Sequence, residues 1–306
     1  MVHLANKTLA AIENSIKYDQ GATYREWLSK VIPHIDDAYR ADKFPFRTHM
    51  GASLIGDECA RKIWYGFRWA KRPNFDGRLL RLFNRGHLEE ARFIAMLLTI
   101  GAEVYQQDEN GKQYRISDAG GHFGGSGDGI VVGIPELPAG SPALLEFKTS
   151  SAKMFAKVKK EGVKLAKFEH YVQMNVYMRK MGLPVALYMV VNKDNDELYA
   201  ELIYFDPETA DQFINRGVEL VFYKEPPDKM KNASPGWFKC KFCDYKNVCH
   251  TNTEPERNCR TCKHSIAKDD GQWYCIESKV DVAFGNMTVL EKQDQLQGCD
   301  KYERLF

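Results

Sequence analysis

Apolar residues recur every three or four positions over the first 47 residues and again over residues 77–100, which predicts helices in both stretches. A shorter helix is predicted from a cap at Ser53 to about Trp69. Between residues 102 and 150 the apolar positions instead form short runs separated by Gly, Asn and Pro, which predicts strands. The chain therefore begins helical and continues as a meander of strands.

Beyond residue 150 the helical spacing returns at Ala152–Glu161 and at Phe168–Met181. Two strands, 185–193 and 197–205, are then predicted on either side of a polar turn, and a further helix at Pro207–Tyr223. The remaining residues are rich in cysteine and have no long periodic element. This order predicts an α/β fold with a mixed sheet flanked by helices, an N-terminal helical region and a small C-terminal metal-binding module.

The composition is that of a globular protein, with 44% hydrophobic and 27% charged residues in a chain of 306, and this excludes a disordered or fibrous chain. We expect an N-terminal region at 1–50, an α/β domain at 51–252 and a C-terminal module at 253–306. The net charge of +2 neither requires nor excludes a polyanionic partner. Charged residues interrupt every long apolar run, so we expect a cytoplasmic protein that does not enter a membrane.

Seven of the eight cysteines follow residue 239, whereas isolated buried thiols would be scattered along the chain. A disulfide framework is not expected in a reducing cytoplasm. The spacing C-x2-C, which brings two thiolates to one metal ion or cluster, begins at Cys240 and again at Cys259. The first group is formed by Cys240, Cys243 and Cys249, and His250 is available as a fourth ligand for zinc.

The second cysteine group is similar to a zinc ribbon in which one pair has been split, and it predicts a bound Zn²⁺. Its members are Cys259, Cys262, Cys275 and Cys299. His264 is a spare candidate ligand, although we expect it to be a solvated side chain.

The strand 144–148 carries an unusual pair of charges. Glu146 and Lys148 point to one face of a strand, and Leu145 and Phe147 to the other. Asp128 stands just before the preceding apolar strand. Two carboxylates and a lysine on neighbouring strands can hold Mg²⁺ and orient an attacking water. The Glu146/Lys148 pair taken alone is more typical of a surface ion pair than of a catalytic site.

Three further residues complete a pattern around these strands. His87 lies on the long helix before them, and Gln173 and Tyr177 share one face of the helix after them. The ordered set His87, Asp128, Glu146-x-Lys148, Gln173-x3-Tyr177 resembles the PD-(D/E)XK nuclease superfamily, and its RecB-type branch most closely, over about residues 50–250.

The resemblance implies a restriction-endonuclease-like fold and a DNA nuclease that depends on Mg²⁺ or Mn²⁺. It implies that His87, Asp128, Glu146 and the backbone carbonyl of Phe147 bind the metal. Lys148 would then orient or deprotonate the water and steady the developing charge. Gln173 and Tyr177 would position the lysine and the DNA strand.

Cys59, which precedes these motifs, extends the first cysteine group to four thiols. One distant cysteine followed by Cys240-x2-Cys243-x5-Cys249 resembles the iron–sulfur nucleases, among them the AddB subunit and the CRISPR-adaptation exonucleases. The resemblance implies a 4Fe–4S cluster, with zinc as the alternative. Cys59 and Cys240 are 181 positions apart, so we expect such a cluster to clasp the chain and to fix the helix carrying His87.

By this resemblance the chain is an exonuclease whose substrate is DNA with a free end or a single-stranded region. It would act in recombination, repair or replication in the bacterial cytoplasm, as a protein of the bacterium or of its phage, with a recombination or replication protein as a partner. A non-catalytic nucleic-acid-binding protein and a redox protein are the alternatives. A run of lysines after the Glu146 strand predicts either a solvated helix face or a contact with phosphates: Lys153, Lys157, Lys159, Lys160, Lys164 and Lys167. His170 could line the cleft or belong to the core.

Overall fold

A computed structural model describes residues 2–39, 44–277 and 287–306, and these form two compact units. Unit 1 comprises Met1–Lys43, Phe75–Ile116 and Ser126–Asp211. Unit 2 comprises Phe44–Asn74, Ser117–Gly125 and Gln212–Phe306. Each unit is therefore assembled from three separate stretches of chain. The division at 1–50, 51–252 and 253–306 remains a prediction, because compactness does not test which segments fold independently.

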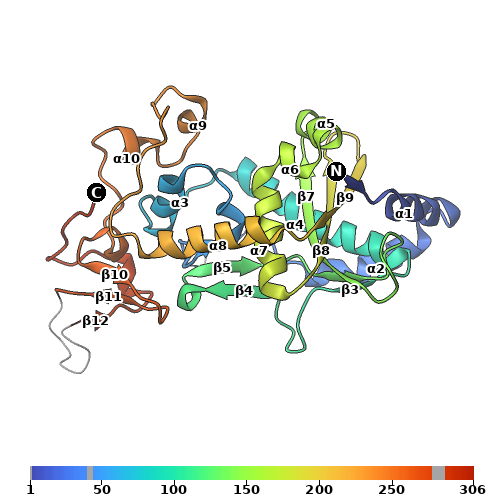
Figure 1. Cartoon of the computed structure of the whole chain (residues 1–306), viewed down its shortest axis with the longest axis horizontal. Helices are drawn as coiled ribbons and strands as arrows, with labels where there is room; N and C mark the ends of the chain where they lie inside the picture. Colours follow the sequence, from blue (N-terminus) through green and yellow to red (C-terminus); the bar gives the residue numbers. More distant parts are fainter. Residues whose placement is uncertain (1, 40–43, 278–286) are drawn as a thin grey trace. The chain divides into compact units, whose positions relative to one another are not determined.

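Unit 1 is built around a six-stranded mixed sheet in the order β1-β9-β8-β7-β6-β3. Its strands are β1 (His3–Leu4), β3 (Glu103–Tyr105), β6 (Ile130–Val132), β7 (Pro142–Ser150), β8 (Val185–Asn192) and β9 (Leu198–Tyr204). Only β7 and β8 run parallel, and parallel neighbours require a crossover connection. The crossover consists of α5 (Ala152–Glu161), α6 (Val163–Ala166) and α7 (Phe168–Met181). The predicted mixed sheet flanked by helices is confirmed (Figure 1).

Helices cover the sheet of unit 1 and form the core with it. They are α1 (Asn6–Tyr18), α2 (Ala22–Val31), the 3-10 turn η1 (Ile32–His34) and α4 (Gly77–Thr99). The carboxylate of Asp76 caps α4 by accepting a hydrogen bond from the N–H of Leu79 at 2.7 Å. Phe93 of α4 stacks on Phe147 of β7 with ring centroids 4.9 Å apart, so this face of β7 belongs to the core.

Unit 2 contains all eight cysteines and has shorter elements. Two three-stranded sheets, β2-β5-β4 and β10-β11-β12, are joined by helices and 3-10 turns. The elements are β2 (Met50–Gly51), η2 (Ala52–Leu54), α3 (Ala60–Phe67), β4 (Arg115–Asp118), η3 (Ala119–Gly121), β5 (Phe123–Ser126), α8 (Pro207–Phe222), α9 (Phe238–Lys241), α10 (Lys246–His250), η4 (Cys259–Thr261), β10 (Ser265–Ala267), β11 (Trp273–Cys275), β12 (Thr288–Val289) and η6 (Asp294–Leu296). The residue ranges of β4, β5 and α8 each begin in one unit and end in the other.

The helix predicted from Ser53 to Trp69 is wrong in its first half. Residues 52–54 form the turn η2, and α3 begins only at Ala60, after Cys59. The side chain of Asp57 accepts the N–H of Cys59 at 2.8 Å. A short polar side chain that bonds a nearby backbone N–H competes with helix formation, and this moves the start of the helix beyond the predicted cap.

Two buried arginines connect the C-terminal residues to the rest of the core of unit 2. Arg68 and Arg260 are each 2% exposed. Arg260 donates hydrogen bonds to the carbonyls of Thr48 and Phe67, and its guanidinium lies 3.8 Å from the ring centroid of Trp69. The C-terminal residues therefore share their core with residues 44–74. No helix in the described part of the chain has the length and apolarity that crossing a membrane requires.

Candidate active site

Asp128 is held at the start of β6 by the backbone around it. The N–H of Phe147 donates a hydrogen bond to Asp128 Oδ2 at 2.7 Å, which ties the carboxylate to β7. Gly129 has a φ of 137°, and a Cβ there would lie 2.7 Å from the carbonyl oxygen of Tyr105. Only glycine fits this close approach to β3, so Gly129 fixes the direction in which Asp128 projects.

Glu146 and Lys148 form the pair expected on β7. Glu146 is 1% exposed, its Oε2 accepts a hydrogen bond from Nε2 of Gln173 at 2.9 Å, and its Oε1 is ion-paired with Lys148. Leu145 and Phe147 are buried in the core on the opposite side, as the alternation of the strand predicted. The pair is not a surface ion pair, because a fully buried carboxylate requires the partners that Lys148 and Gln173 provide.

Helix α4 contributes two side chains to the same place. His87 Nδ1 lies 3.7 Å from Glu90 Oε1, one helical turn along. Both line an open groove of about 440 Å³ together with Thr149 and Lys193. Glu90 was missed by the motif analysis, although its position three residues after His87 places it on the same helix face and could have indicated it.

Tyr177 and Gln173 of α7 support the two carboxylates in different ways. Gln173 contacts Glu146, as described above, while the hydroxyl of Tyr177 donates to the carbonyl oxygen of Ser126 at 2.9 Å. The ring of Tyr177 also lies against Gly127, so it holds the loop that delivers Asp128. The expected positioning of Lys148 and of a DNA strand by these two residues remains a prediction.

The acidic groups share a strongly unfavourable electrostatic environment. Burial raises the pKa of Glu146 to about 7, and the repulsion from Asp128 adds to the effect of burial. Burial also raises the pKa of Asp128, against the attraction of Lys148 and His87. The pKa of Glu90 is raised to about 8, first by burial and then by Asp128. Burial alone would lower the pKa of Lys148, but attraction to Glu146 and Asp128 raises it.

This donor set fits a hard divalent cation. Carboxylate oxygens are the ligands that Mg²⁺ and Mn²⁺ prefer, and a cation would relieve the repulsion that raises the carboxyl pKa values. Asp128, Glu146 and Glu90 could supply the oxygens, with His87 beside them.

His170 lies next to this site on α7. Its Nδ1 is 3.1 Å from the hydroxyl of Tyr188, which pairs with Glu146 across β7 and β8. Burial lowers the pKa of His170 to about 3, and the nearby charge of Lys148 adds to the shift. The imidazole is therefore neutral and lies against Tyr188 of β8.

The lysine run after β7 is partly engaged in ion pairs. Lys157 pairs with Glu161, Lys159 with Glu197, and Lys164 with Asp206. These contacts favour a solvated helix face at those three positions, and contact of the run with phosphates stays a prediction.

The four cysteines of the first group all belong to unit 2. Burial raises the pKa of Cys243, and proximity to Cys59 raises it further. Burial likewise raises the pKa of Cys249, with Cys59 and Cys240 adding to it. The Nε2 atom of His250 is buried and has no hydrogen-bond partner in the structure. The repulsion between Cys59 and the later cysteines agrees with the predicted grouping, binding of a cluster stays a prediction, and His250 keeps the zinc alternative open.

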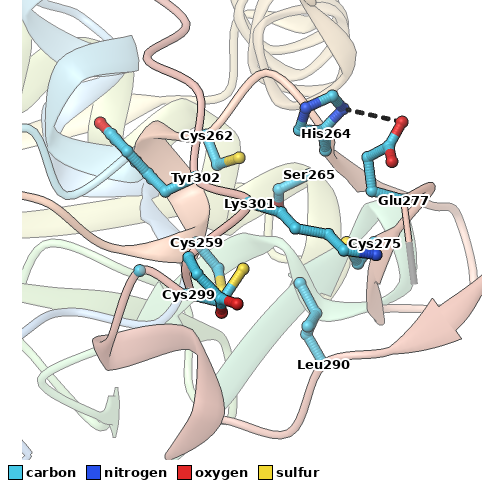
Figure 2. A pocket seen from close by; sticks show the side chains of 12 residues that line it. Cys259, Cys262, His264, Ser265, Cys275, Glu277, Leu290, Cys299, Lys301 and Tyr302 are labelled. Atoms are coloured by element: carbon cyan, nitrogen blue, oxygen red, sulfur yellow. Dashed lines mark ion pairs between the residues drawn. The ribbon is translucent and has the colours of Figure 1, made fainter.

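The second cysteine group lines one pocket of about 280 Å³ in unit 2 (Figure 2). Burial raises the pKa of Cys259 to about 12, and the neighbouring Cys262, Cys275 and Cys299 add to the rise. His264 also lines the pocket but is 8% exposed, so the expectation that it is solvated is wrong. Its Nε2 atom lies 3.1 Å from Glu303 and its Nδ1 atom 3.8 Å from Glu277, which engages both ring nitrogens.

Four thiols around one pocket have the chemistry of a zinc site. Among the residues that the structure describes, however, no group of three or more His, Cys, Asp or Glu side chains is already arranged around a metal position.

Neither a profile of a known protein family nor a curated protein matches this chain. Among solved structures, the alkaline exonuclease LHK-Exo from Laribacter hongkongensis is similar with a TM-score of 0.40 and 15% identity, over 64% of this chain and 90% of that chain. Its complex with dAMP gives a TM-score of 0.42 and 16% identity, over 57% and 86%. The protein SSO0001 gives 0.40 and 15%, over 76% and 99%.

Proposed function

We propose that the chain is a metal-dependent deoxyribonuclease of the PD-(D/E)XK type that degrades DNA from an end. The observation that supports this is the contact of a buried carboxylate, Glu146, with Lys148 and Gln173 beside the fixed carboxylate of Asp128. Such a cluster is costly to bury and has the groups that phosphodiester hydrolysis needs.

Asp128 and Glu146 would hold Mg²⁺ or Mn²⁺, with Glu90, His87 and the carbonyl of Phe147 as further ligands. When bound, the cation would neutralise phosphate charge and lower the pKa of a water. Lys148 would stabilise the charge that develops on the phosphate, because its ammonium group is already fixed beside Glu146. Gln173 would keep Glu146 in its orientation, and Tyr177 would hold the loop of Asp128.

The test is digestion of end-labelled linear DNA and of closed circular DNA in the presence of Mn²⁺. We expect loss of label from the linear DNA only. Asp128→Ala, Glu146→Ala and Lys148→Ala should each reduce the rate by roughly a hundredfold or more, as expected for groups that act on the transition state. The matched control is Lys30→Ala, which removes an exposed lysine that is ion-paired with Glu26 on α2 and has no assigned role. Undiminished cleavage by Lys148→Ala would contradict the catalytic role assigned to Lys148. DNA binding by the wild type without cleavage would favour a non-catalytic nucleic-acid-binding protein.

We further propose that Cys59, Cys240, Cys243 and Cys249 bind a 4Fe–4S cluster and that Cys259, Cys262, Cys275 and Cys299 bind Zn²⁺. The proximity of the thiols within each group supports both proposals. A role in recombination, repair or replication, a protein partner and a cytoplasmic location belong to the same proposal and rest on the motif resemblance.

A further inference from the structure

Two phenylalanines stand far out from unit 2 around the short helix α9. Phe238 is 72% exposed and Phe242 is 71% exposed. They are four positions apart, on the same side of the helix, and their ring centroids lie 5.4 Å apart with an interplanar angle of 68°. Among the large hydrophobic side chains that the structure describes, only Tyr18 and Leu165 are more exposed.

The two rings lie within a basic stretch of unit 2. Residues 229–246 contain five lysines and a single aspartate, although the whole chain has a net charge of only +2. The Nζ atom of Lys241 lies 5.6 Å from the ring centroid of Phe242, and that of Lys239 lies 6.0 Å from the ring of Trp237. Positive charge is therefore interleaved with aromatic surface in residues 237–246, which we term the aromatic–lysine segment.

We propose that the aromatic–lysine segment binds single-stranded nucleic acid, with Phe238 and Phe242 stacking on bases and Lys241 contacting phosphates. Exposed rings combined with a basic surface are typical of sequence-independent single-strand binding, since every base has a face on which a ring can stack. A folded protein partner usually covers about 800 Å² on each side, and two rings alternating with charges are a poor match for such an interface. This inference deepens the proposed nuclease function by naming the form of DNA that the chain holds.

The test is fluorescence anisotropy of a labelled oligothymidylate of about 20 nucleotides, without added divalent metal so that no cleavage occurs. We expect the wild-type chain to bind it, and Phe238→Ala and Phe242→Ala to weaken binding by about tenfold each. The double variant Phe238→Leu/Phe242→Leu keeps apolar surface without aromatic faces and should weaken binding by about a hundredfold. Tyr18→Ala is the control, because it removes a ring of unit 1 that is 92% exposed and should leave binding unchanged.

Two further measurements separate stacking from indirect effects. Lys241→Gln should reduce the slope of log affinity against log salt by about 0.7, the value for one phosphate contact on a single strand. Iron content and melting temperature are measured for every variant, because Phe242 lies between Cys240 and Cys243 and a bound cluster would change the local charge.

The proposal is overturned if the phenylalanine variants bind like the wild type, if the double leucine variant retains full affinity, or if duplex DNA competes as well as single-stranded DNA. If a phenylalanine variant loses iron, its weaker binding has two explanations, and the salt dependence of Lys241→Gln then tests the proposal. A slope reduced by about 0.7 supports binding by this segment, and an unchanged slope overturns it. Cleavage of linear DNA together with unaltered binding by the variants would reject this inference alone. Stacking-dependent binding without any cleavage would reject the proposed nuclease function alone.

Discussion

Protonation of single carboxyl groups should control metal binding in unit 1. The pKa of Glu146 is raised to about 7 and that of Glu90 to about 8, both chiefly by burial, so protons compete with a cation near neutral pH. We expect Mn²⁺ to bind more weakly as the pH falls from about 8.5 to about 6, by up to roughly tenfold per pH unit for each carboxyl group that must lose a proton. Isothermal titration calorimetry at several pH values measures this. An affinity independent of pH would show that these carboxylates do not hold the metal.

Gln173 offers a separate test at the residue scale. Its hydrogen bond to Glu146 Oε2 lowers the pKa of that carboxyl, so Gln173→Leu should raise the pKa further. We expect the acidic limb of the pH profile of kcat/KM to move to higher pH. Gln20→Leu, at an exposed glutamine, serves as the control. An unshifted limb together with a lower rate would mean that Gln173 acts on the substrate instead.

The motif residues could be predicted from the sequence because each belongs to an ordered pattern of residue types. The spacing of Glu90 from His87 indicates a shared helix face, but its proximity to Asp128 and Glu146 could not be predicted, because it depends on how α4 packs against distant strands. The burial of His264 was missed for a similar reason, because its partner Glu303 lies 39 positions further along the chain.

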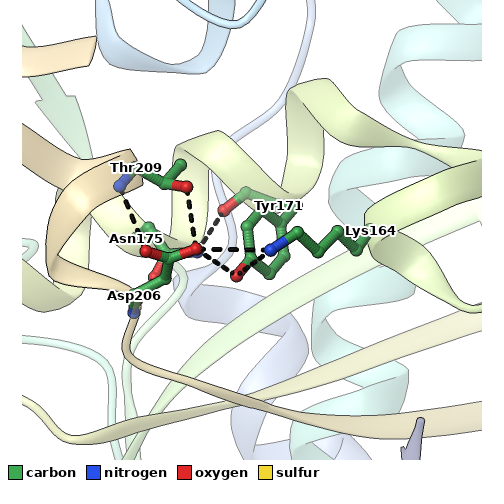
Figure 3. A network of polar contacts seen from close by, with 5 residues as sticks. All are labelled: Lys164, Tyr171, Asn175, Asp206 and Thr209. Atoms are coloured by element: carbon green, nitrogen blue, oxygen red, sulfur yellow. Dashed lines mark hydrogen bonds and ion pairs between the residues drawn. The ribbon is translucent and has the colours of Figure 1, made fainter. Parts of the chain in front are cut away.

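The start of α8 shows how one side chain fixes an element. Asp206 precedes Pro207 and accepts hydrogen bonds from the N–H of Thr209 at 3.1 Å, from its hydroxyl at 2.8 Å, and from the hydroxyl of Tyr171 at 2.9 Å (Figure 3). Asp206→Ala should therefore destabilise the chain by about 1–2 kcal/mol, measured by urea unfolding at neutral pH. Asp211→Ala removes a half-exposed ion pair from the same helix and should cost at most about 0.5 kcal/mol. Equal losses in both variants would contradict a capping role.

The carboxyl group of Asp206 also predicts that the stability of the fold depends on pH. Burial raises the pKa of Asp206, but the hydrogen bonds from Thr209, Tyr171 and Lys164 outweigh it and lower the pKa to about 2. Because the folded pKa lies below the ordinary value of 3.8, the contribution to stability is complete above about pH 4 and is lost as the pH falls towards 2. The difference in urea midpoint between wild type and Asp206→Ala should shrink over that window, and a constant difference would contradict this.

Helices with a strong amphipathic period were predicted with their first and last residues nearly correct. The bounds of α5 and α7 agree with the predicted helices, since amphipathic spacing and flanking glycines define their ends locally. The order of strands within the sheet and the pairing of β1 with β9 depend on contacts between distant residues and could not be predicted.

For the whole molecule, the two cysteine groups should bind their metals independently. Cys243→Ala should lower the iron content while leaving about one zinc ion per chain, and Cys262→Ala should do the reverse. Elemental analysis of the purified full-length variants checks this. Loss of both metals from either variant would indicate a shared site, and zinc in place of iron at the first group would favour the ligand set with His250.

The division into two units changes which part of the chain a cluster at Cys59 and Cys240 is expected to stabilise. Cys59 precedes α3 in unit 2, whereas His87 lies on α4 in unit 1, so a cluster would stabilise the unit that contains it. In the chain-entropy picture, closing a loop of 181 positions restricts the unfolded chain by on the order of 5 kcal/mol. Cys59→Ala should therefore lower the melting temperature of the iron-loaded protein. An unchanged melting temperature despite loss of iron would contradict a structural cluster.

The pairing of β1 with β9 has a consequence during synthesis on the ribosome. His3 pairs with Leu202, so the first strand of the sheet is made 199 positions before its partner. At translation rates of about 5–20 residues per second, that interval lasts roughly 10–40 seconds. Throughout that time α1, which contacts β9, has an apolar face without its partner strand. The nascent chain is therefore a candidate for chaperone binding until β9 leaves the ribosome, and the sheet can close only then.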